Sequence, residues 1–131
     1  MRLRIAALAS ALLVVFAALA ASGLARSRTR HYTGRAGAGD AYAMSFSVSR
    51  GRVVGFTFVS RCPGLRNGTT VPARIRIVGG RFHYRDEQFT ISGRFLRGGM
   101  ARGTERDRTG DCDSGTLDWA ARLAISPRFT G

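Results

Sequence analysis

The sequence predicts an all-β protein, a single antiparallel β-sandwich or small barrel of about seven to eight short strands. Three observations support this fold class. Apolar and polar residues alternate with period two over most of the chain from residue 31 to residue 123. Glycine-containing turns interrupt the alternation at regular, short intervals, which leaves no room for parallel crossovers. Finally, no segment after residue 25 shows a helical period.

The first 25 residues are typical of a secretory signal peptide rather than of the folded domain. Arg2 and Arg4 precede an apolar run from residue 5 to residue 21, and small residues follow it. We therefore expect a signal-peptide helix at 1–25 and a secreted β domain at 26–131. The alternative is an uncleaved membrane anchor, although a run of about 17 residues is at the short end for a membrane span. Either way, the protein is predicted to be extracellular or in the cell envelope.

The alternation places individual strands and their inward faces. Val54, Phe56 and Phe58 are expected to point inward, and the same phase carries Ser60 and Cys62 inward. In the last strand, the residues expected on the inner face are Leu117, Trp119, Ala121 and Leu123. The predicted strands are 31–35, 44–48, 54–58, 71–77, 82–84, 89–95, 100–105 (the weakest) and 115–123.

Cys62 and Cys112 are the two cysteines of the chain. Two cysteines in an exported protein most often form a disulfide, and both are predicted to face inward. A Cys62–Cys112 bridge would close a loop of about 50 residues and stabilise the fold by about 4 kcal/mol. The alternative is a pair of free thiols.

Four short sequence segments resemble those of a group of known proteins. They are VSRGRV (48–53), RCPG (61–64), FTISGRF (89–95) and CDSGTLDWAA (112–121). Together they resemble small secreted Arg/Gly-rich β domains of GC-rich bacteria. The resemblance covers residues 31–123; it supports the fold and the disulfide and implies no activity.

The charge of the chain is strongly positive, with 21 basic residues, all of them arginine, against 8 acidic residues. Such a field attracts anionic polymers, although a GC-rich genome would also enrich arginine over lysine. We predict an anion-binding face, formed by arginines that point outward from the strands among Ser and Thr residues. Its candidate residues are Arg52, Arg74, Arg76 and Arg94.

The partner expected at this face is an anionic envelope polysaccharide or another polyanion. Nearly all Phe and Tyr residues follow the inward phase, so the face lacks base-stacking rings. We therefore expect no specific nucleic-acid binding. Membrane contact is expected only through an uncleaved signal segment. The sequence indicates no particular oligomeric state.

The residue types that usually carry catalysis are poorly placed for it. Asp111, Asp113 and Asp118 alternate with inward residues and are expected to lie in solvent, ionised and with lowered pKa values beside arginines. His31 and His83 are isolated and fit no zinc-binding or triad spacing. We therefore predict no catalytic residue, no metal site and no cofactor, and hence no enzyme.

A second hypothesis concerns the loop from Pro63 to Thr69, directly after Cys62. It would present Leu65 and Arg66 on a tethered turn. A tethered loop loses little entropy on binding, so it could act as a small secreted protease inhibitor. The first hypothesis remains an exported, non-enzymatic structural or binding module.

Overall fold

The computed structural model describes residues 28–62 and 68–125. The predicted signal peptide at 1–25 and the candidate inhibitor residues Leu65 and Arg66 lie outside these ranges. The described chain contains strands and one short 3-10 helix, η1 (Ala38–Asp40). The strands are β1 (Arg30–Ala36), β2 (Tyr42–Ser49), β3 (Arg52–Phe58), β4 (Thr69–Thr70), β5 (Ile75–Arg76), β6 (Arg81–Arg85), β7 (Phe89–Leu96), β8 (Met100–Thr109), β9 (Cys112–Asp113) and β10 (Leu117–Leu123).

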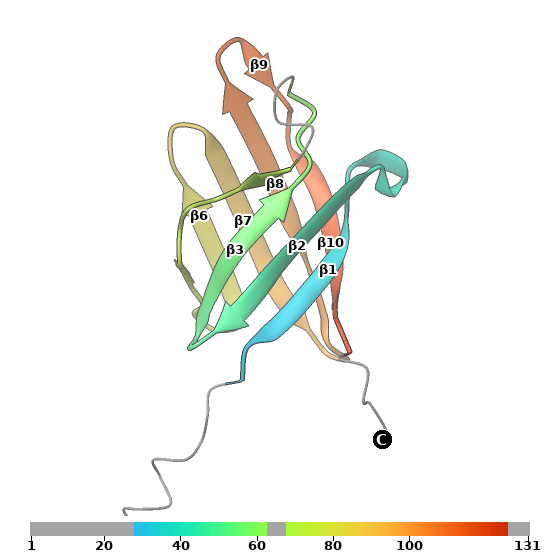
Figure 1. Cartoon of the computed structure of the whole chain (residues 1–131), viewed down its shortest axis with the longest axis vertical. Coiled ribbons are helices and arrows are strands. Elements are labelled where there is room, and N and C mark those ends of the chain that lie inside the picture. Colours follow the sequence, from blue (N-terminus) through green and yellow to red (C-terminus); the bar gives the residue numbers. More distant parts are fainter. Residues whose placement is uncertain (1–27, 63–67, 126–131) are drawn as a thin grey trace, which may run out of the picture.

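The strands form an antiparallel sheet in the order β4-β3-β2-β1-β10-β8-β7-β6. Strand β5 also pairs with β3, and β9 pairs with β8. The sheet curls strongly, so that β3 and β2 lie in front of β7 and β8 in Figure 1 and enclose the core as a half-barrel. The predicted all-β, antiparallel architecture is confirmed, and it is built from one curled sheet rather than two packed sheets.

The hairpin between β2 and β3 contains a departure from the predicted alternation. Arg50 and Gly51 both have positive φ, 50° and 71°, which suits a tight hairpin turn. Further along, Gly55 has φ 60°, and the β2–β3 register shifts beside it. This bulge adds one residue to β3. The predicted inward position of Val54 is therefore wrong: Val53 is fully buried and Val54 is half-buried.

An aromatic cluster fills the inside of the half-barrel. Phe46 is at its centre, and its ring stacks on those of Tyr32 and Phe56 and meets that of Trp119 edge-on. Two glycines that face each other on β7 and β8 make room for these rings. A Cβ atom on Gly93 would lie 2.3 Å from the Phe82 ring, and one on Gly103 would lie 2.7 Å from the Trp119 ring. Side chains at these positions would therefore collide with the core.

The disulfide closes one end of the half-barrel. Cys62, after β3, is bonded to Cys112 at the start of β9, with the two Cα atoms 5.7 Å apart. The predicted pairing is confirmed. Nearby, β8 continues to Thr109 instead of ending at Glu105 as predicted, because it pairs with both β7 and β9. Further along the edge of β8 that β9 occupies, β10 begins at Leu117 and not at Gly115.

In the 71–77 segment the inward and outward positions are as predicted, but most of the residues are not in a strand. Only Ile75 and Arg76 pair as β5, while Val71 and Ile75 are buried and Arg74 and Arg76 are exposed. Within residues 28–62 and 68–125, no helix has the length and apolar character needed to cross a membrane.

Candidate anion-binding groove

Antiparallel register aligns four arginines in one line across the outer face of the sheet. Arg81 on β6 is opposite Arg94 on β7, and Arg94 is opposite Arg102 on β8. The line continues through Ala120 on β10 to Arg35 on β1. Neighbouring strands are about 4.8 Å apart, so the line extends over about 19 Å. We call Arg81, Arg94, Arg102 and Arg35 the arginine row.

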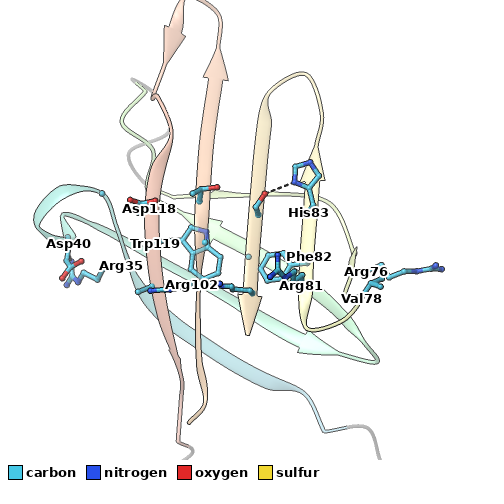
Figure 2. Close-up of a pocket in the computed structure, with 17 residues that line it drawn as sticks. Arg35, Asp40, Arg76, Val78, Arg81, Phe82, His83, Arg102, Asp118 and Trp119 are labelled. Carbon is cyan, nitrogen blue, oxygen red and sulfur yellow. Dashed lines mark hydrogen bonds between the residues drawn. The ribbon is translucent and has the colours of Figure 1, made fainter. Parts of the chain in front are cut away.

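A second line of polar residues runs beside the arginine row, two positions away on each of β6, β7, β8 and β10. His83 is opposite Ser92, Ser92 is opposite Thr104, and Thr104 is opposite Asp118. The His83 Nδ1 atom and the Ser92 hydroxyl are 2.8 Å apart and form a hydrogen bond (Figure 2). This polar row therefore offers hydroxyl, imidazole and carboxylate groups next to the guanidinium groups.

The two rows line a groove of about 1030 Å³ on the outer face. In Figure 2, Arg35 and Asp40 lie at one end of the groove and Arg76 and Val78 at the other, with Arg102 and Arg81 between them. Strand backbone forms the floor, because the rings of Phe82 and Trp119 belong to the buried core. The groove is therefore long and open, and charged and polar side chains stand along it.

The groove has more positively than negatively charged side chains. Residues 28–62 and 68–125 contain one ion pair, between Arg106 and Asp113, and neither of these residues lines the groove. Among the described residues, the acceptor of the Arg35 side chain is the backbone oxygen of Asp40, at 3.5 Å. Like charges directly opposite each other on neighbouring strands destabilise a sheet. An anionic ligand lying on the arginine row would relieve this repulsion.

The candidates chosen from the sequence divide between two regions. Arg76 and Arg94 line the groove. Arg52 and Arg74 do not; they lie together at the β3–β5 edge, where an Nη1 of Arg52 donates to the backbone oxygen of Arg74 at 3.4 Å. Sequence reasoning missed Arg35, Arg81 and Arg102. Their outward phase was available from the alternation, but their alignment depends on a register that one strand does not reveal.

The three aspartates considered from the sequence are all exposed, as the alternation predicts. Asp113 accepts from both the Nε and an Nη2 of Arg106, and its Oδ1 also accepts from the backbone N–H of Gly115 at 2.9 Å. The Arg106 hydrogen bond, with the Gly115 contact, lowers the pKa of Asp113 to about 2. A carboxyl group so strongly ionised is unsuited to act as a general acid. Asp118, in contrast, lies in the polar row of the groove.

Sequence reasoning missed a pair of buried acids on the inner face of β8. Asp107 is 1% exposed, and its carboxylate accepts from Ser60 Oγ at 2.5 Å and Thr109 Oγ1 at 2.9 Å. Glu105 is 2% exposed, and neither of its carboxyl oxygens has a hydrogen-bond partner among the described residues. Burial, reinforced by the charge of Asp107, raises the pKa of Glu105 to about 8. Glu105 therefore stays protonated and neutral at pH 7.

A comparison of this chain with protein-family models, with curated proteins and with solved structures finds no match. The two adjacent rows of the groove, one of guanidinium groups and one of hydrogen-bonding groups, suit a ligand that carries both negative charges and hydroxyl groups.

Proposed function

We propose that this protein is an exported, non-enzymatic binding module that holds an anionic polymer in the groove through the arginine row. The observation that carries the proposal is the cross-strand alignment of Arg81, Arg94 and Arg102, with Arg35 beyond Ala120. A genome rich in GC raises the number of arginines but does not align them. The Cys62–Cys112 disulfide supports export, because disulfides persist in oxidising compartments.

The chemistry of the groove favours an acidic polysaccharide. Guanidinium groups bind carboxylate, sulfate and phosphate with paired, charge-assisted hydrogen bonds. The polar row adds Ser92, Thr104 and Asp118, which can exchange hydrogen bonds with sugar hydroxyls. Proteins that bind single-stranded nucleic acid combine a positively charged groove with aromatic rings on which the bases stack. The two aromatic residues at the groove floor, Phe82 and Trp119, have their rings buried in the core and offer no such platform.

Charge-matched variants test the proposal with polygalacturonate, a linear polyanion, as the probe. The row variant carries Arg81→Gln, Arg94→Gln and Arg102→Gln. The control carries Arg28→Gln, Arg50→Asn and Arg74→Gln, which remove the same charge from exposed positions outside the groove. Asparagine is chosen at position 50 because it tolerates the positive φ found there.

We expect the row variant to bind polygalacturonate at least about tenfold more weakly than the wild type, since it loses three charge-assisted contacts. The control should lose much less affinity, and binding of the wild type should weaken as salt is added. Isothermal titration calorimetry measures all three proteins, with circular dichroism to verify folding. Equal losses in the two variants would show that net charge, and not the row, accounts for binding.

A further inference from the structure

The outer face contains a second, smaller pocket beyond the polar row. It has a volume of about 190 Å³, and arginines and threonines make up most of its lining. Register explains why they meet: Arg85 is opposite Thr90, and Thr90 is opposite Arg106. Thr104 lines both this pocket and the groove. The full lining is Arg85, Thr90, Thr104, Glu105, Arg106, Arg108 and Thr116.

The wall of this pocket contains a buried donor without an acceptor. The Nε atom of Arg108 is inaccessible to solvent and has no hydrogen-bond partner among the described residues. Leaving a buried donor unpaired is costly, and more so when the donor is charged. Because Arg108 lines the pocket, a small movement of its side chain would bring this donor to an oxygen atom of a ligand bound there.

A neighbouring guanidinium group is already held in place. Arg106 is anchored from outside the pocket by Asp113, which accepts from its Nε at 2.9 Å and also from Nη2. This pair leaves the Nη1 group of Arg106 available to a ligand. Asp113 itself is occupied by Arg106 and Gly115 and does not line the pocket.

Glu105 does not oppose an anion in this position. Its carboxyl oxygens are buried and alternation points its side chain to the inside, so it contributes backbone to the pocket floor. The inward acid that lies beside it, Asp107, is tied to Ser60 and Thr109. The walls of the pocket therefore combine three guanidinium groups with the hydroxyls of three threonines.

We propose that this pocket is a binding site for one tetrahedral oxyanion, phosphate or sulfate, distinct from the groove. The site accepts the free ion or a phosphate or sulfate substituent on a larger ligand, because the chemistry of recognition is the same. Guanidinium N–H groups pair with two oxygens at once, and the threonine hydroxyls donate to the others. The proposal does not depend on polymer binding in the groove.

Titration with inorganic phosphate, with sulfate and with chloride at matched ionic strength tests the site. The probe signal is the ¹H–¹⁵N resonance of Arg108 Nε in the folded, disulfide-bonded wild type. We expect phosphate and sulfate to shift it saturably and chloride to leave it in place. Arg108→Gln should weaken the affinity for phosphate, measured by calorimetry, at least about tenfold. The control, Arg74→Gln, should leave that affinity unchanged.

Two further variants separate this site from the groove and from a diffuse positive field. Arg108→Lys keeps the charge but loses the forked donor, so it should also bind phosphate more weakly. The row variant should keep its phosphate affinity. The proposal is overturned if Arg108→Lys binds as well as the wild type, if the row variant abolishes phosphate binding, or if chloride moves the Arg108 signal as sulfate does. A loss of polygalacturonate binding alone would bear only on the groove.

Discussion

Replacing Glu105 with glutamine is expected to remove most of the loss of stability that this protein suffers as pH rises from 5 to 8. The pKa of Glu105 is raised from 4.5 to about 8 in the folded protein, first by burial and then by the charge of Asp107. Over most of this range the Glu105 carboxyl group is ionised in the unfolded chain and protonated in the folded chain. Stability is therefore full below pH 4.5 and falls as pH rises through the folded pKa.

The expected effect is large because most of the interval between the two pKa values of Glu105 lies between pH 5 and pH 8. One pKa unit corresponds to about 1.4 kcal/mol, so the wild type should lose about 3 kcal/mol relative to the variant between pH 5 and pH 8. Urea unfolding of the wild type and of Glu105→Gln at each pH unit measures this difference. Burying the glutamine amide changes the unfolding free energy of Glu105→Gln by the same amount at every pH. This cost therefore does not affect the comparison, which concerns how each unfolding free energy changes with pH.

The exposed Glu87 provides the matched control, since Glu87→Gln removes a carboxyl group that lies in solvent. This variant should follow the wild type at every pH. The lowered pKa values of Asp86 and Asp113 affect stability only under more acidic conditions, below the range used. If Glu105→Gln and the wild type lost stability in parallel from pH 5 to pH 8, Glu105 would be ionised in the folded state and this account of it would be wrong.

Removal of the disulfide is expected to have an effect of similar size. Cys62 and Cys112 are separated by 50 residues in the sequence, and closing such a loop stabilises the fold by about 4 kcal/mol in the chain-entropy model. The bond also holds Cys62 beside the buried network, since the Cys62 backbone N–H donates to Ser60 Oγ and Ser60 donates to Asp107. The double variant Cys62→Ala/Cys112→Ala should therefore unfold at a much lower urea concentration.

Equilibrium unfolding of the double variant and of the oxidised wild type checks this prediction. Dithiothreitol should bring the wild type close to the variant and should leave the variant unchanged. A difference in unfolding free energy below about 1 kcal/mol would mean that the bridge adds little to this half-barrel.

Much of the fold could be predicted from the sequence because the alternation of apolar and polar residues is so regular. The inward positions of Cys62 and Trp119 followed from parity alone, and the disulfide followed from the two cysteines. Parity fails where a bulge adds a residue. Gly55 shifts the register of β3 and brings Val53 rather than Val54 into the core, and an apolar run of two valines gives no sign of which one turns inward.

The candidate site was harder to predict, since its essential feature is the alignment of side chains from different strands. Arg76 and Arg94 were identified from their outward phase, but the contribution of Arg81 and Arg102 depends on the pairing of three strands. The buried acids were missed for another reason. The alternation that places Ala101 inside also places Glu105 and Asp107 inside when it is continued along β8. Acidic side chains are rarely buried, so this continuation of the alternation was not expected.

The central claim, that the arginine row forms the binding surface, is tested most directly on the wild-type protein. Arginine Nε resonances, followed by NMR during titration with polygalacturonate, report each guanidinium group separately. We predict that the signals of Arg81, Arg94 and Arg102 shift together and saturate at one polymer concentration, while those of Arg28, Arg50 and Arg74 stay nearly fixed. Equal shifts at all exposed arginines would contradict the claim, because they would show that the polymer responds to overall charge and not to the row.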